Sequence, residues 1–133
     1  MKVVLDTNIL ISSLFWSGVP RLMVNLAISQ EINSFTSIYI LEELQSVLFE
    51  SFNLPKDKIK DIIKDVLSYS EVIKTKDHHI KIRDQKDAKV IDCAISVKAS
   101  YIITGDKDLL VLKQVKKIKI LTPSDFLKTI KSA

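Results

Sequence analysis

Four of the 16 acidic residues in this 133-residue chain stand in separate segments at positions that favour a shared site: Asp6, Glu43, Asp87 and Asp106. Asp6 follows the apolar run VVL, and Asp106 follows the run YII after one threonine and one glycine. Glu43 and Asp87 lie in segments whose apolar residues recur at helical spacing. Two carboxylates about 4 Å apart repel by about 4 kcal/mol at an effective dielectric of 20, so a cluster of them must take up protons or bind a cation.

A site built from carboxylate oxygens alone prefers hard ions. Without His or Cys ligands, such a site selects Mg²⁺ or Mn²⁺. One or two of these ions can polarise a phosphodiester, lower the pKa of a bound water and stabilise the leaving oxygen. Phosphodiester hydrolysis is therefore one reaction that these acids can support, on the condition that the fold brings the four of them together.

The segment ILEELQSVL contains two adjacent glutamates, which helical geometry separates. At about 100° per residue, the apolar side chains form one stripe, made of Ile40, Leu41, Leu44, Val47 and Leu48. Glu43 falls at the edge of this stripe, and Glu42 points nearly the opposite way. We therefore expect Glu43 to reach a site beside the core and Glu42 to face solvent.

The segment RDQKDAKVIDCAI offers three aspartates. Asp87 lies in line with the buried stripe of the predicted helix, one turn before Ile91, whereas Asp92 lies on the far side and is expected at the surface. Asp84 precedes the helix and can cap it, with Asp87 three residues on as in a capping box. Asp84 is also a further candidate ligand, so capping and metal binding both stay open here.

Polar residues near the two strand ends can support a metal site. Asp106 can bind the ion or cap the next helix, and Asp108 is either a further ligand or a favourable charge in the first turn of that helix. Thr7, Asn8 and Thr104 can orient ligands or waters. Residues of these types also serve as turn and cap residues, which is an equally good interpretation of Thr7.

Several other reactive or aromatic residues are interpreted as non-catalytic. His78 and His79 stand in a polar segment without matched ligands and are expected at the surface. Phe15 and Trp16 are interpreted as core or dimer contacts rather than as a platform for base stacking. Cys93 lies on a helix that looks buried and is interpreted as a small core residue.

The elements that must position these residues alternate along the chain. Strands are predicted at residues 2–5, 33–37, 71–73, 101–104 and 117–121, and helices at 20–29, 38–50, 55–68, 86–98, 106–112 and from 123 onward. This alternation predicts a parallel sheet with helices on both faces. Ligands of such sheets bind at the carboxyl ends of the strands, where Asp6 and Asp106 stand.

Composition narrows the class of protein. The length fits one domain over residues 1–133, and 47% apolar residues fit a globular protein. No apolar run approaches the roughly 18 residues of a membrane span, and no signal peptide is recognised. A single cysteine excludes an internal disulfide and fits a cytoplasmic protein. With four acids assigned to metal, 20 basic and 12 acidic residues leave +8 on the rest of the chain, which suits an RNA or DNA partner.

The chain strongly resembles PIN-domain proteins, in the branch of toxin components of toxin–antitoxin pairs. Four segments carry the resemblance, in the order and approximate spacing of that family: LDTNILISSLFWSGVPRLMV, ILEELQSVL, RDQKDAKVIDCAI and YIITGDKDLLVL. The resemblance implies an α/β/α sandwich around a mostly parallel sheet and an Mg²⁺- or Mn²⁺-dependent ribonuclease that leaves 5′-phosphate and 3′-hydroxyl ends. It also implies a homodimer and inhibition by an antitoxin protein. Four acids match the acidic positions of the family, namely Asp6, Glu43, Asp87 and Asp106.

Two positions depart from the pattern of similar proteins. Gln85 stands where they often carry Pro, and Ala88 where they often carry Asn or Asp, which removes one polar group near the expected metal. One alternative is therefore a PIN module with weak or lost activity that binds RNA or protein. Another is phosphotransfer through an aspartyl phosphate, although such enzymes typically carry Asp where this chain has Asn8.

Overall fold

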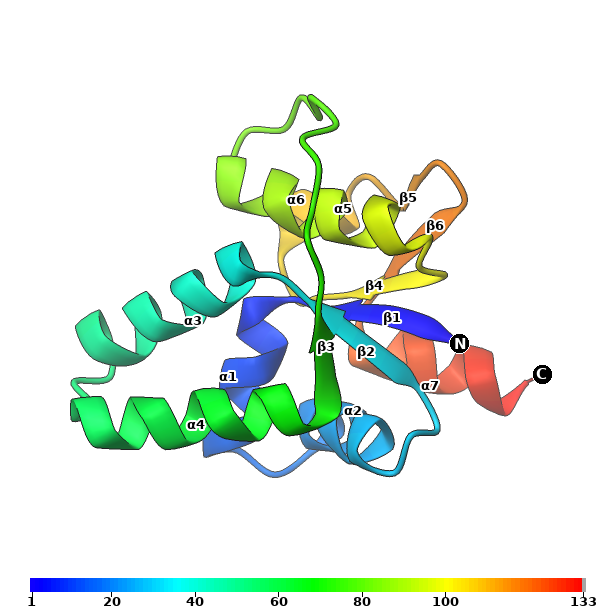
Figure 1. The fold of residues 1–133 in the computed structure, drawn as a ribbon. Coiled ribbons are helices and arrows are strands. Elements are labelled where there is room, and N and C mark those ends of the chain that lie inside the picture. The colour runs from blue at the N-terminus through cyan, green and yellow to red at the C-terminus, as the bar shows by residue number, and fades with distance from the viewer. Residues whose placement is uncertain (133) are drawn as a thin grey trace.

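The computed structural model describes residues 1–132, which form six strands and seven helices (Figure 1). The strands are β1 (Lys2–Leu5), β2 (Asn33–Thr36), β3 (Ser70–Val72), β4 (Tyr101–Ile103), β5 (Gln114–Val115) and β6 (Ile118–Leu121). The helices are α1 (Thr7–Phe15), α2 (Val19–Ile28), α3 (Ile38–Glu50), α4 (Lys56–Tyr69), α5 (Gln85–Val97), α6 (Lys107–Leu110) and α7 (Pro123–Lys131).

The strands form one sheet in the order β3-β2-β1-β4-β6-β5. Neighbouring strands are parallel except β5 and β6, which form an antiparallel hairpin. The chain first builds outward from β1 through β2 to β3, and then returns to the other side of β1 with β4. The direction of growth therefore reverses between β1 and β4, which is where open α/β sheets bind their ligands.

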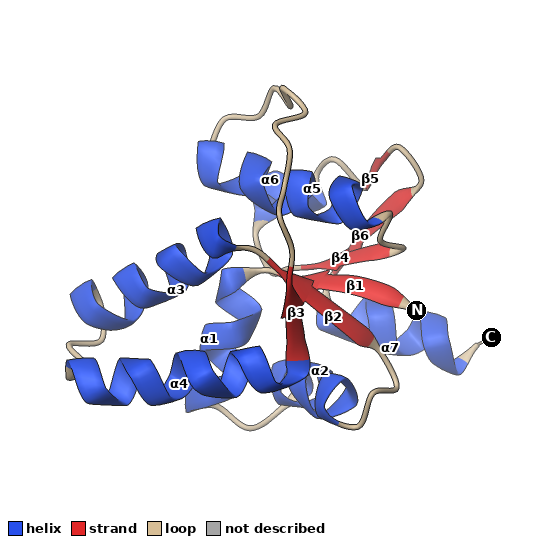
Figure 2. Ribbon diagram, viewed as in Figure 1, coloured by secondary structure: helices blue, strands red, loops and turns tan. Residues whose placement is uncertain are grey.

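Helices cover both faces of this sheet (Figure 2). In that view α5 and α6 lie on one side and α1, α2 and α7 on the other, while α3 and α4 extend from the sheet. Helix α5 packs against β1, β2 and β4, and α7 packs against β6. The central strands are buried on both sides, which explains why Val3, Val4 and Ile102 read as continuous apolar runs. The arrangement confirms the predicted sandwich with a mostly parallel sheet.

Side-chain caps explain where several helices begin. The side chains of Ser37, Asp84 and Thr122 accept backbone N–H groups of α3, α5 and α7.

The predicted ranges of strands and helices agree with the observed elements to within a few residues. Helix α1 and strand β5 were not predicted. Helix α1 follows β1 with only Asp6 between them, and its sequence TNILISSLF is apolar around most of its circumference, so it lacks a clear polar face.

The prediction that Asp92 lies at the surface is wrong. Asp92 is 3% exposed because its side chain contacts the segment between β3 and α5, which passes close to α5 (Figure 1). Its Oδ1 accepts the backbone N–H of His78 at 2.9 Å and lies 3.1 Å from His78 Nδ1. His78 is consequently half-buried, whereas His79 is exposed as predicted.

Phe15 and Trp16 do not belong to the core. Their exposed fractions are 39% and 60%. The ring of Phe15 stacks on Phe52 with centroids 4.5 Å apart, and Trp16 meets Phe15 edge-on.

Among residues 1–132, no single helix has the length and apolar composition to cross a membrane. Helices α1 and α2 have this length and composition only as a pair, and the pair is bent by 102°.

Candidate functional site

Asp6 and Asp106 meet at the centre of the sheet because they follow the neighbouring parallel strands β1 and β4. The backbone N–H of Asp6 donates to the Ile103 carbonyl at 3.0 Å, which extends the pairing of β1 with β4 by one residue. Each aspartate also caps the helix that follows: Asp6 Oδ1 accepts Thr7 N–H, and Asp106 Oδ1 accepts Asp108 N–H. Capping and convergence on one site therefore coexist at both positions.

Asp6 is held by hydrogen bonds to both carboxylate oxygens. Thr7 N–H donates to Oδ1 at 2.8 Å, and the Thr104 hydroxyl donates to Oδ2 at 2.7 Å. Burial raises the pKa of Asp6 to about 6 against the lowering effect of these hydrogen bonds, and the charges of Glu43 and Asp106 raise it further. The carboxylate is thus fixed in position but costly to keep ionised without a cation.

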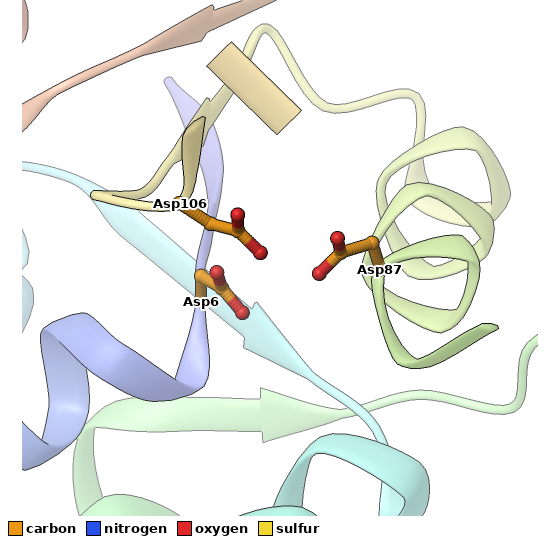
Figure 3. Close-up of side chains that lie close together, drawn as sticks. All are labelled: Asp6, Asp87 and Asp106. Carbon is orange, nitrogen blue, oxygen red and sulfur yellow. The ribbon is translucent and has the colours of Figure 1, made fainter. Parts of the chain in front are cut away.

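Asp87 reaches the same place from the first turn of α5 (Figure 3). One carboxylate oxygen from each of Asp6, Asp87 and Asp106 lies within 4.8 Å of the others. Asp87 is 5% exposed, and its Oδ2 is buried without a hydrogen-bond partner. Burial raises the pKa of Asp87 to about 8, and the adjacent Asp106 side chain is the second cause of this rise. In the absence of a cation, the Asp87 carboxyl group therefore holds a proton at neutral pH.

Glu43 lies beside this group of three rather than within it. Its Oε2 accepts the Thr7 hydroxyl at 3.1 Å, and its charge contributes to the raised pKa of Asp6. Glu43 is half-buried, whereas Glu42 is exposed, as the helical spacing predicts. Thr7 therefore links two of the predicted acids, with its N–H on Asp6 and its hydroxyl on Glu43.

Asp84 and Asp108 do not join the three clustered aspartates. Asp84 Oδ1 accepts Lys86 N–H at the start of α5 and so acts as the cap. Asp108 makes an ion pair with Arg83, with Oδ2 at 2.9 Å from the guanidinium. The sequence analysis did not single out Arg83, because its partner is 25 residues away and no local pattern links them.

The remaining predicted polar residues tie the two strand ends together. Thr104 Oγ1 accepts Asp106 N–H at 2.9 Å while its hydroxyl donates to Asp6. Asn8 Oδ1 accepts Gly105 N–H at 3.3 Å. Ala88, one of the two departures, is 6% exposed and directly follows Asp87, so no polar side chain is available there.

The donor set fits a hard divalent cation. Ligand oxygens at about 2.1 Å from one Mg²⁺ lie up to about 4.2 Å apart, which is close to the spacing of these three carboxylates. The unpartnered Oδ2 of Asp87 is the kind of buried acceptor that a cation satisfies. Neither His78 nor Cys93 belongs to this group, which leaves oxygen donors alone.

Residues 2–108 match the model of the family described as PIN domain, and the chain belongs to this family. The match includes each of the clustered aspartates. Among solved structures, the chain is similar to a chain in the crystal structure of VapBC2 from Rickettsia felis bound to a DNA fragment from their promoter. That alignment has a TM-score of 0.66 and 18% identity and covers 90% of this chain and 97% of the other. No curated protein matches the sequence.

Proposed function

We propose that the protein is a metal-dependent endoribonuclease. The observation that carries this proposal is the convergence of Asp6, Asp87 and Asp106, from three separate segments, within 4.8 Å. Membership of the PIN domain family supports it, since the resemblance implies an Mg²⁺- or Mn²⁺-dependent ribonuclease. The excess of basic residues supports a polyanionic substrate.

The three aspartates and Glu43 would hold the cation, which is Mg²⁺ or Mn²⁺. When bound, such an ion polarises a phosphodiester and makes a water molecule more acidic. Thr104 and Thr7 keep the Asp6 oxygens in position without reorganisation during the reaction. Asp87, whose pKa is raised by burial, would have to lose its proton to solvent to act as a negatively charged ligand, and its unpartnered Oδ2 would be available to the cation.

The products and partners follow from the family resemblance. We propose cleavage to 5′-phosphate and 3′-hydroxyl ends by a single domain over residues 1–133. We further propose that the chain is the toxin of a type II toxin–antitoxin pair, a homodimer that an antitoxin protein inhibits. The similarity to a chain of VapBC2 from Rickettsia felis supports an antitoxin partner. A cytoplasmic setting, suggested by the single unpaired thiol of Cys93, is part of the same proposal.

A matched pair of variants tests the chemistry. Asp6→Asn removes one charge from the cluster, and Asp61→Asn removes the same charge from the exposed face of α4. Single-stranded RNA cleavage in Mn²⁺ should fall at least 100-fold in Asp6→Asn, should persist in Asp61→Asn and should stop in EDTA. Unchanged cleavage by Asp6→Asn would refute the proposed mechanism.

A second candidate is a PIN module that binds RNA or protein without cleaving it. The observation in its favour is Ala88, which directly follows Asp87 and carries a buried methyl group where similar proteins often carry a polar side chain. Calorimetric titration with Mn²⁺ separates the two candidates. Binding that Asp87→Asn abolishes supports the nuclease, and no binding at millimolar Mn²⁺ supports the module.

A further inference from the structure

A groove between α3 and α5 opens beside Glu43. Its cavity volume is about 240 Å³. Tyr39, Glu42 and Glu43 line it from α3, and Lys86 and Lys89 line it from α5. Because Glu43 belongs both to the candidate metal site and to this lining, a ligand in the groove lies next to the position where a phosphodiester would be cut.

The groove combines an aromatic ring with two cations. Lys89 Nζ lies 4.5 Å from the centroid of the Tyr39 ring, a cation–π contact. Tyr39 is 44% exposed, so part of this residue remains accessible to a ligand beside Lys89. Lys86 and Lys89 are three residues apart and therefore lie on neighbouring positions of one side of α5. Neither lysine makes an ion pair within residues 1–132.

The position of the lysines answers an electrostatic problem of the proposed nuclease. RNA is a polyanion, and the four clustered or adjoining carboxylates repel it even when a divalent ion neutralises part of their charge. Lys86 immediately precedes Asp87 in α5, and Lys89 follows it by two residues. Cations so close to the cluster can compensate the repulsion and bind the phosphates that flank the one to be cut.

We infer, on the basis of the proposed function, that this groove is a binding site for single-stranded RNA. Lys86 and Lys89 contact backbone phosphates, and Tyr39 stacks on a base next to the cleaved phosphodiester. A base inside a duplex is already stacked and cannot lie on the Tyr39 ring, so the arrangement selects unpaired RNA. Glu42 faces the same groove and weakens the binding of the polyanion.

RNA binding in EDTA tests the inference without requiring cleavage. The probe is a short fluorescent single-stranded RNA, and the measurement is its anisotropy against protein concentration. The double variant Lys86→Gln/Lys89→Gln should weaken binding about 10-fold and lower the log–log slope of affinity against salt by about 1.4. Tyr39→Ala should weaken binding about 10-fold. Glu42→Gln, which removes a negative charge, should tighten binding about 3-fold.

The control removes two lysines elsewhere. Lys60 and Lys64 are exposed on α4, which packs on the other side of α3 (Figure 1). Lys60→Gln/Lys64→Gln has the same net charge as the groove variant and should bind RNA like the unmodified protein. Tyr39→Phe keeps the ring and should retain binding, which separates stacking from a role of the hydroxyl. An equal effect of both lysine pairs would overturn the inference, because it would show that only net charge matters.

Cleavage kinetics separate the failure of this inference from the failure of the nuclease proposal. The groove variants should raise KM for single-stranded RNA with little change in kcat, whereas Asp6→Asn should lower kcat. A hairpin with the same sequence in paired form should be bound and cut at least 10-fold less well. If Asp6→Asn abolishes cleavage but the groove variants leave KM and RNA affinity unchanged, the nuclease stands and the RNA groove is refuted. If a paired hairpin binds as tightly as the single strand, or Tyr39→Ala binds normally, the groove is a site for something other than unpaired RNA.

Discussion

The hydroxyl of Thr104 donates to Asp6 Oδ2 at 2.7 Å across 98 residues of sequence. Thr104 Oγ1 also accepts the N–H of Asp106 at 2.9 Å, so one fully buried threonine contacts two aspartates of the candidate site at once. Sequence analysis named Thr104 as a group that orients ligands, and the structure shows which atoms it contacts.

Thr104→Val should weaken both the site and the fold. The substitution keeps the shape but leaves Asp6 Oδ2 and the Asp106 N–H without their partner, at a cost of about 1–3 kcal/mol in the free energy of unfolding. Affinity for Mn²⁺, measured by calorimetry, should fall about 10- to 100-fold. Thr104→Ser keeps the hydroxyl and should restore most of the affinity. Equal affinities of the valine and serine variants would show that the hydroxyl does not position the ligands.

The stability of the metal-free protein should decrease as the pH rises. Burial raises the pKa of Asp6 to about 6 and that of Asp87 to about 8, so the folded chain holds protons that the unfolded chain has already lost. Stability from these protons is complete below about pH 4 and is lost as the pH passes through the two folded-state values. Urea unfolding at about pH 5 and about pH 8.5 measures the difference, with Mn²⁺ expected to reverse the loss at high pH. A metal-free protein that gains stability over this range would contradict the predicted protonation of the site.

Asp87→Asn should separate stability from metal binding. An amide needs no proton to stay neutral, so the free energy of unfolding of the metal-free protein at about pH 8 should rise by roughly 2 kcal/mol. Mn²⁺ binding and RNA cleavage should both be lost, because a negative ligand is missing. The two effects have opposite signs, and thermal unfolding with and without Mn²⁺ measures both. A variant that binds Mn²⁺ normally would remove Asp87 from the ligand set.

Asp92 should matter for the fold although it lies outside the site. Its buried carboxylate accepts the backbone N–H of His78 and lies beside the His78 ring. These contacts connect the segment before α5 to the helix. Asp92→Ala leaves these groups unpaired and should cost about 1–3 kcal/mol. Amide hydrogen exchange of residues 74–84 should accelerate most. Uniform exchange changes across the chain would show that Asp92 has no special role in that segment.

Asp108 should be dispensable for metal binding. It is ion-paired with Arg83, and the pair is largely exposed. Asp108→Ala should change the free energy of unfolding by less than about 1 kcal/mol and should leave Mn²⁺ affinity within about 2-fold of the original. Arg83→Ala is the matched control for loss of the pair. A large loss of affinity in Asp108→Ala alone would return Asp108 to the candidate ligands.

The sequence was sufficient to predict five of the six strands and the apolar stripes of α3 and α5. The spacing of apolar residues and the residues that end an element are local features of the sequence, so both can be recognised without the structure. The burial of Asp87 and the exposure of Glu42 followed from helical geometry alone. The position of Asp6 and Asp106 at one edge followed from their place after parallel strands.

Contacts made by irregular segments were not predictable. The sequence around Asp92 looks like that of an exposed acid on an amphipathic helix. Asp92 is buried only because residues 74–84 pass close to α5. The Arg83–Asp108 pair and the cavity beside Tyr39 likewise depend on how two distant segments are placed in space. Residue spacing along the sequence does not predict such placements. Helix α1 was missed because an apolar run without a polar side has no periodic signal.

The reversal of strand order between β1 and β4 has a consequence for folding. Asp6 and Asp106 belong to one side-chain cluster but are 100 positions apart in the sequence. A partly folded state that has paired β1 with β2 but not with β4 leaves one edge of β1 open and the cluster incomplete. The cluster therefore depends on a contact of high sequence separation, which is slow to form because a long loop must first be closed.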